Sequence, residues 1–267
     1  MPRPGRAALI LLAAVALAGC ENKKRLTAQF THDDAVVAAP PTPTHYVNAT
    51  PDAKIELVLP ADIARYPDLH AKLFNDGKQE LLDFLKHAIE DRRRFAKKGV
   101  SQPTPYERRV VWTITAVTPN LISLREGWFD DTGGAHPNHG SGALLWDRMR
   151  SVMLLQGELF KPDADTTALD AVLCRATTRA KEARVGPSDP KTWSCPRFSD
   201  SHALLVPSTR PYRIGGMMFL FDPYLIGAYA EGDYEVLIPL SDFQPLLAPA
   251  WAGDFAGSPA PSVKPRP

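Results

Sequence analysis

Residues 1–20 constrain the chain most, because they determine which side of a membrane its folded part can occupy. Arg3 and Arg6 precede an apolar run over residues 7–18. The run is shorter than the ~20 apolar residues that a membrane-spanning helix needs. It ends in Leu17-Ala18-Gly19-Cys20, and small residues before a cysteine resemble a bacterial lipobox. The pattern predicts a lipoprotein signal peptide over residues 1–19 and lipidation of Cys20. The alternative is an ordinary secretory signal with an incidental cysteine.

The expected location follows from this signal. The mature chain is expected on the periplasmic side of the cell envelope, attached to a membrane through its lipid. Glu21 follows the cysteine, whereas aspartate there is the better-known inner-membrane retention signal, so the outer membrane is slightly favoured. Removing residues 1–19 takes away two arginines and no acids, so the formal net charge changes from +1 to −1. No nucleic-acid partner is expected, because phosphate binding needs a concentrated basic surface.

Composition divides the rest of the chain into three parts. Residues 20–51 contain Lys23-Lys24-Arg25 and a proline cluster but no sustained apolar period, which predicts a lipid anchor and flexible tether. Residues 251–267 are rich in Pro, Ala and Ser and are predicted to be a disordered tail. Residues 52–250 suit one domain with a substantial core, or two closely packed halves.

Cys174 and Cys195 are left as a pair once Cys20 is assigned to the lipid. An even pair in an oxidising compartment predicts a disulfide. Two free or metal-binding thiols are the alternative, but the spacing of the pair matches no Cys-x-x-Cys zinc or redox pattern.

The apolar periodicity predicts an α+β fold. A helical period covers residues 68–97, as one helix or two, and a second helix is expected over residues 165–184. Alternation with period two predicts a β-hairpin with strands near residues 109–116 and 122–128. Further strands are expected at residues 54–59, 142–149, 203–206, 217–221 and 234–238. Runs of strands interrupted by two helical blocks favour a mainly antiparallel sheet with both blocks packed on it.

Four segments, in order, resemble the RsiV-type extracellular domain. They are Leu121-Ile122-Ser123-Leu124, Thr132-Gly133-Gly134-Ala135-His136, residues 154–160 and the closing unit over residues 221–240. Lysozyme-sensing anti-sigma factors share this domain with an accessory region of some peptidoglycan deacetylases. The resemblance spans residues 53–247 and implies an envelope-exposed α+β module whose best understood role is to bind lysozyme.

The chain departs from those relatives at its start. Only six residues precede the apolar run, so no cytoplasmic sigma-binding segment and no transmembrane helix are expected, which argues against an anti-sigma function. The separate catalytic domain of the deacetylases is not expected either, so their activity does not transfer.

The glycine segment raises the possibility of metal chemistry. Asp130 and Asp131 precede it, and with His136 and His139 they form a candidate set of metal ligands for a deacetylase-like hydrolase. Against this, a threonine interrupts the Asp-Asp-Gly order that such deacetylases use, and Pro137 forbids a regular helix interior between the two histidines. The structural interpretation is a strand break in which Gly133 and Gly134 supply unusual dihedrals and a buried His136 bonds across the sheet. We expect this second role for His136.

Aromatic residues offer a binding surface instead. Trp128 and Trp146 flank the glycine segment, and Tyr224 and Tyr229 lie in the closing unit. Strand alternation predicts that some of them belong to the core. If Trp146 and the tyrosines are exposed together, they form a platform for a sugar ring or a protein partner.

The sequence therefore predicts a cell-envelope lipoprotein with a non-catalytic domain that binds peptidoglycan or a lysozyme-like muralytic protein. No cofactor is expected. The alternative is a metal-dependent, deacetylase-like hydrolase acting on cell-wall glycan. The G-x-S-x-G, Walker A and H-E-x-x-H patterns do not occur in the chain.

Overall fold

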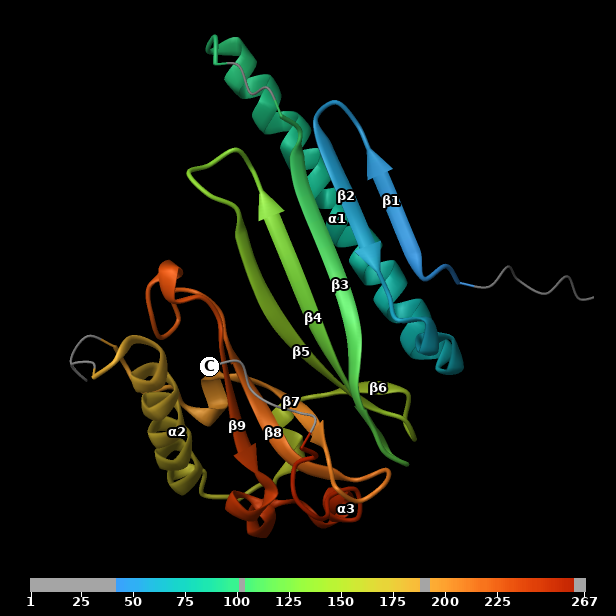
Figure 1. The fold of residues 1–267 in the computed structure, drawn as a ribbon. Helices are drawn as coiled ribbons and strands as arrows, with labels where there is room; N and C mark the ends of the chain where they lie inside the picture. Colours follow the sequence, from blue (N-terminus) through green and yellow to red (C-terminus); the bar gives the residue numbers. More distant parts are fainter. Residues whose placement is uncertain (1–41, 101–103, 188–192, 262–267) are drawn as a thin grey trace, which may run out of the picture. The chain divides into compact units, whose positions relative to one another are not determined.

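Two β-sheets organise the chain. The computed structural model describes residues 42–100, 104–187 and 193–261, and within these ranges nine strands form a six-stranded and a three-stranded sheet (Figure 1). The predicted α+β class is confirmed. The predicted signal peptide over residues 1–19, Cys20 and most of the predicted tether lie outside the described residues.

The larger sheet has its strands in sequence order. They are β1 (His45–Ala49), β2 (Ala53–Val58), β3 (Tyr106–Val117), β4 (Leu121–Asp131), β5 (Asn138–Asp147) and β6 (Val152–Leu154). The expected hairpin is β3 and β4, which pair antiparallel from Glu107 opposite Asp131 to Val117 opposite Ile122. The β2–β3 pair is parallel, while the other pairs of this sheet are antiparallel. The mainly antiparallel prediction therefore holds with one exception.

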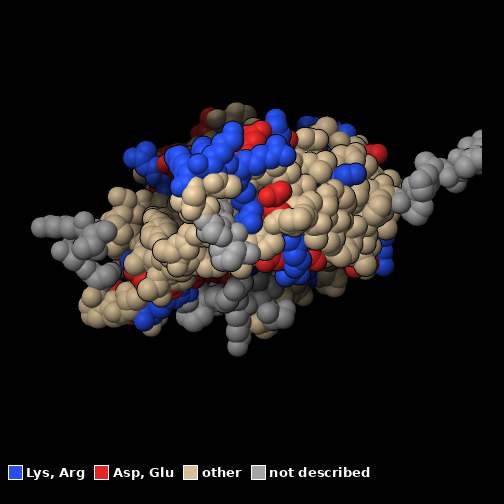
Figure 2. Space-filling view, turned by 90° about the horizontal axis from the view of Figure 1, so that it is seen from above, with Lys and Arg blue, Asp and Glu red and all other residues tan. Residues whose placement is uncertain are grey.

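Helix α1 (Pro67–Lys97) connects the two parallel strands and is one continuous helix. Its apolar stripe, which includes Leu69, Leu73 and Leu81, packs on the sheet with the even-numbered residues of β3, β4 and β5. Proline at the first helical position suits its start, and Gly99 at φ 73° follows its end. Figure 2 shows Lys and Arg side chains gathered around this end of the molecule. The basic last turns suit the negative end of the helix dipole.

The smaller sheet carries a second core. It consists of β7 (His202–Pro207), β8 (Ile214–Phe221) and β9 (Tyr234–Pro239), all antiparallel. Helix α2 (Thr167–Val185) contributes Leu169 and Leu173 to this core, which also contains Phe219, Phe243 and other residues near the C-terminus. The remaining elements are short. They are helix α3 (Pro249–Ala252) and 3-10 helices at Ala61–Arg65, Gln156–Leu159, Phe198–Asp200, Tyr229–Glu231, Leu240–Asp242 and Gln244–Leu246.

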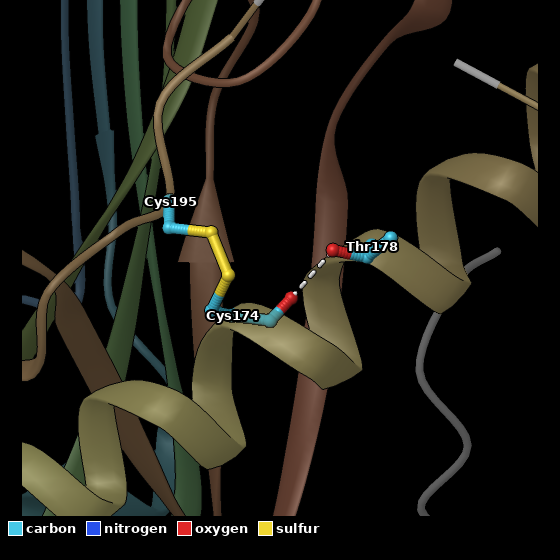
Figure 3. The surroundings of a disulfide bond; sticks show 3 residues. All are labelled: Cys174, Thr178 and Cys195. Carbon is cyan, nitrogen blue, oxygen red and sulfur yellow. Dashed lines mark hydrogen bonds between the residues drawn. A yellow bond between two sulfur atoms is a disulfide. The ribbon is translucent and has the colours of Figure 1, made fainter. Parts of the chain in front are cut away.

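Cys174 and Cys195 form a disulfide, as predicted, with their Cα atoms 5.1 Å apart (Figure 3). Cys174 lies on α2, where its carbonyl accepts a hydrogen bond from Thr178 Oγ1 at 2.9 Å. The disulfide therefore attaches the segment around Cys195, which lies outside the regular elements, to a helix of the second core.

Ordered structure extends beyond both predicted domain boundaries. Strand β1 lies inside the predicted tether of residues 20–51, and the backbone carbonyl of Pro43 bonds the buried His70 Nε2 at 3.0 Å. In the predicted tail of residues 251–267, Trp251 and Phe255 are buried in the second core. Both predictions were wrong for these residues because pairing and burial arise from distant parts of the chain, which local composition does not show.

No helix in the described ranges has the length and apolar character that would let it cross a bilayer.

Candidate functional site

The loop between β8 and β9, residues 222–233, covers an open edge of β5. Strand β6 pairs only with Leu145–Asp147, so no strand of the described ranges pairs with the earlier part of β5 on that side. The loop supplies bonds there: Ser141 N donates to Asp222 Oδ1 at 2.8 Å, and Tyr229 Oη donates to the Pro137 carbonyl at 2.7 Å. His139 Nε2 lies 3.0 Å from Asp233 Oδ1. Covering a free edge in this way prevents strand addition by another chain.

These contacts bring the glycine segment and the closing unit together. The rings of His136 and Tyr229 stack with centroids 4.0 Å apart, and Tyr224 lies 5.7 Å from Tyr229. Tyr224 and Leu225, at the start of the loop, expose 65% and 62% of their surface. We call His136, Tyr224, Leu225 and Tyr229 the aromatic loop surface.

The expected burial of His136 was wrong. His136 is exposed, its Nδ1 lies 2.8 Å from the Pro137 carbonyl, and its Nε2 lies 3.4 Å from Tyr224 Oη. The reason is that residues 132–137 form a loop beyond the paired ends of β4 and β5, so His136 does not lie within the sheet. Gly133 does adopt a left-handed conformation, with φ 73°, as expected for a strand break.

The two tryptophans do not join this surface equally. Trp146 is 5% exposed and belongs to the core beneath α1, so it is not part of an exposed platform. Trp128 is half-buried, with the Arg108 guanidinium 5.3 Å from its ring centre. A Cβ atom at Gly140 would lie 2.4 Å from Trp128 Cζ2 and 2.5 Å from Asp222 Oδ2. A glycine is therefore required where Trp128, β5 and the loop meet.

A hollow of about 310 Å³ lies beside these residues. Its lining combines aromatic rings with carboxylate, amide and imidazole groups: Trp128, Asp130, Asn138, His139, Asp222, Pro223, Tyr224, Leu225 and Tyr229. Burial raises the pKa of Asp222, and the hydrogen bond from Ser141 N opposes that shift. Burial also raises the pKa of Asp130, against the effect of Arg108.

The candidate metal ligands do not converge. Asp130 and Asp131 are successive strand residues, so their side chains lie on opposite faces of the sheet. Asp130 Oδ2 accepts from Arg108 at 2.8 Å, whereas Asp131 Oδ1 accepts from Gly133 N at 2.9 Å. No group of three or more His, Cys, Asp or Glu residues in the described part of the chain has the geometry to hold a metal ion.

The site also lacks the connections of an activated serine. Ser141 Oγ accepts from Arg125 at 3.1 Å, and His139 bonds Asp233 rather than a hydroxyl. A nucleophile of this kind needs a base within hydrogen-bond reach. Rings and polar groups that lie side by side, as they do here, are typical of sites that recognise a ligand.

Sequence reasoning missed Asp222 and Asp233, which fix the loop to β5. Their partners lie about eighty and ninety residues away along the chain, with |i−j| values of 81 and 94. Only Gly140, a glycine within a strand, gave a local signal of close approach.

Comparison with known proteins supports the fold. Residues 158–241 match the family model described as "Protein of unknown function (DUF3298)". The chain resembles the crystal structure of a DUF3298 family protein from Pseudomonas aeruginosa, with 19% identity, a TM-score of 0.54, and coverage of 80% of this chain and 94% of that one. A DUF3298 family member from Bacteroides fragilis aligns with 18% identity and a TM-score of 0.48, over 76% of this chain and 87% of its own. No curated protein matches the sequence significantly.

Proposed function

We propose that this protein is a non-catalytic binding module of the cell envelope, with an RsiV-type domain that contacts peptidoglycan or a lysozyme-like muralytic protein through the aromatic loop surface. The observation that carries this proposal is the exposure of Tyr224 and Leu225 next to the stacked His136 and Tyr229. Large exposed side chains on an anchored loop are typical of a binding surface. The match of residues 158–241 to the DUF3298 family model covers the closing unit, which contains Tyr224, Leu225 and Tyr229.

The aromatic loop surface is held in place before any ligand arrives. The loop is fixed at three points, because Asp222 and Asp233 bond residues of β5 and Tyr229 bonds the carbonyl of the residue before that strand. A surface that is already ordered loses less conformational entropy on binding than a mobile loop does. Tyr224 and Leu225 are therefore well placed to act as anchoring residues for a ligand.

The hydrolase alternative gains no support from the described residues. A deacetylase-like mechanism needs a metal bound by several side chains. The candidate ligands Asp130, Asp131, His136 and His139 form no such group in the described part of the chain and are engaged by other partners.

The test compares two variants of the mature chain. Tyr224→Ala combined with Leu225→Ala removes two large exposed side chains of the aromatic loop surface. Tyr212→Ala is the matched control, because Tyr212 is 75% exposed and shares the positive φ of Tyr224, 55° against 73°. Co-sedimentation with purified sacculi measures peptidoglycan binding, and size-exclusion chromatography with lysozyme measures protein binding.

We expect the wild type and Tyr212→Ala to bind in one of these two assays and the loop variant to lose that binding. Loss of binding of about 2 kcal/mol or more would identify the loop as the centre of the interface. Binding that persists in the loop variant would contradict the site. Failure of the wild type in both assays would contradict the function.

Membrane attachment is a separate part of the proposal, because Cys20 lies outside the described residues. We propose that the lipid on Cys20 anchors the protein at the periplasmic face of a membrane. Cys20→Ser should yield an unprocessed or soluble protein, because stable anchoring requires the attached acyl chains. Membrane fractionation after a high-salt wash would contradict this if the variant remained bound with a processed N-terminus.

A further inference from the structure

A larger cleft lies on the face of the six-stranded sheet opposite α1. Its volume is about 720 Å³, within the range of ~300–1,000 Å³ that is usual for small-molecule sites. Its floor comes from β3, β4 and β5, and its wall comes from the second sheet. None of the four residues of the aromatic loop surface lines it, so a ligand in this cleft is independent of the proposed function.

Gly127 makes the centre of the floor hollow. The strand register places it between Val111 of β3 and Ser141 of β5. A Cβ atom at Gly127 would meet only the Val111 carbonyl oxygen, at 3.9 Å, and the backbone is not left-handed there. The conformation therefore does not require glycine, and its effect is to leave space within the cleft.

The wall beside this space is apolar. Leu204 and Val206 of β7 and Met218 of β8 line the cleft, and all three belong to one small hydrophobic cluster. Val111 and Phe129 add apolar surface from the floor. Strands β3 and β4 are paired on both sides, so their backbone groups are engaged within the sheet. The floor therefore offers an extended peptide few backbone partners, whereas an aliphatic chain needs none.

Most charged groups of the cleft are matched within the protein. Arg125 Nη1 lies 2.6 Å from Glu235 Oε1, and its Nη2 donates to Ser141. His139 is paired with Asp233. The members of each pair satisfy one another, so these groups do not favour a charged ligand.

Arg109 is ion-paired as well, but its side chain is more exposed than that of Arg125. Its Nε lies 3.1 Å from Glu56 Oε2, and its side chain remains 51% exposed. Glu56 is its one ion-pair partner among the residues that the structure describes, so the exposed part of the guanidinium is accessible to a further acid. Paired N–H groups in this planar arrangement match a carboxylate, which they can bind with two hydrogen bonds.

We propose that the cleft binds a monocarboxylate with an aliphatic chain, whose chain lies over Gly127 against Leu204, Val206 and Met218 and whose carboxylate bonds Arg109. The apolar wall contributes binding free energy in proportion to the area of the aliphatic chain that it buries. Arg109 distinguishes the acid from a neutral analogue.

The test is calorimetric titration of the mature chain with hexanoate, octanoate and decanoate, and with octanol as the neutral analogue of octanoate. We expect affinity to rise by about fourfold per added methylene while the chain still enters the cleft. Octanoate should bind about tenfold more tightly than octanol.

Two variants locate the binding. Gly127→Leu fills the floor and should abolish binding of all three acids, and Arg109→Gln should weaken octanoate about tenfold while leaving octanol unchanged. Gly253→Leu is the matched control, because no atom lies within 4 Å of the Cβ position there and Gly253 does not line the cleft. Thermal unfolding verifies that each variant is folded, and Gly127→Val replaces Gly127→Leu if the larger side chain prevents folding.

Absence of binding by the wild type would overturn the proposal. Binding that survives filling at Gly127 would place the ligand elsewhere and would also overturn it. Equal affinities for octanoate and octanol, unaffected by Arg109→Gln, would refute the assigned carboxylate contact. None of these results depends on whether the aromatic loop surface binds peptidoglycan or lysozyme.

Discussion

The imidazole of His136 stacks on the phenol ring of Tyr229, with centroids 4.0 Å apart and planes inclined by 28°. The two residues come from segments far apart in the sequence, and their contact joins the glycine loop to the β8–β9 loop. Because both rings lie near the surface, the stacking organises a loop rather than a core.

The stacked pair predicts that substitutions at His136 and at Tyr229 change the stability of the fold by different amounts. His136→Ala should change the free energy of unfolding by less than about 1 kcal/mol, because the side chain is exposed. Tyr229→Phe keeps the ring but removes the hydrogen bond to the Pro137 carbonyl, at a cost of about 1 kcal/mol. Urea denaturation measures both. A loss above about 2 kcal/mol for His136→Ala would show that the histidine is structural after all.

Glu231 predicts a pH dependence of stability. Its Oε2 accepts from Lys181 Nζ at 2.7 Å and from Tyr234 Oη at 2.5 Å, and these bonds, that of Lys181 first, lower the pKa of Glu231 from 4.5 to about 2. A carboxyl group whose pKa is lower in the folded state stabilises the fold above its unfolded pKa. That contribution is lost as the pH falls from about 4.5 towards 2.

Glu231→Gln should therefore cost about 1.5–3 kcal/mol at neutral pH, and the difference from wild type should shrink through the same pH range. Denaturant unfolding at several pH values measures this. Glu182→Gln on the exposed side of α2 is the control and should follow the wild type. Parallel pH profiles for wild type and Glu231→Gln would contradict the assignment.

The C-terminal segment should be required for stability. Trp251 is 6% exposed, and its Nε1 donates to the Glu158 carbonyl at 2.8 Å, so Trp251→Ala should cost about 3–5 kcal/mol. Ala252→Ser, at the exposed neighbouring position, should have little effect. Thermal and chemical denaturation distinguish the two variants. A cost near zero at Trp251 would mean that the segment does not pack in solution.

The disulfide should contribute about 3 kcal/mol, because it closes a segment with a sequence separation of 21 residues. Replacing Cys174 and Cys195 by serine should lower the unfolding midpoint, and a reductant should lower the midpoint of the wild type only. Mass mapping under non-reducing conditions should recover the linked peptides. Recovery of both thiols alkylated from unreduced protein would contradict the bond.

The strongly periodic elements were predictable from local sequence. The hairpin of β3 and β4 alternates along its length, and α2 carries its apolar residues at helical spacing, so each element follows from its own residues. Strand β1 was not predicted because it is a short edge strand of mixed polarity, with no continuous apolar face. The parallel pairing of β2 with β3 was also missed, since two strands with similar patterns do not reveal their relative direction.

The candidate site was predictable only in part. The resemblance placed the glycine segment and the closing unit in one family pattern, but the contact between His136 and Tyr229 depends on how the second sheet packs. Trp146 near the end of β5 and Tyr229 in the β8–β9 loop are both candidate aromatic residues, yet Trp146 is buried beneath α1 and Tyr229 is partly exposed. Gly127 shows the same limit, because a glycine in a strand does not reveal that a cleft lies above it.

Helix α1 is longer than the strand it mainly accompanies. Its 31 residues extend about 46 Å, whereas the six residues of β2 extend about 20 Å. None of its residues after Ala88 is buried. Arg92 still holds the helix through Asp52, but the last turn beyond it gains little from tertiary packing. The backbone amides of that turn should exchange with solvent through local fraying, far faster than those near Leu73 and Leu81, which open only when the sheet beneath them comes apart.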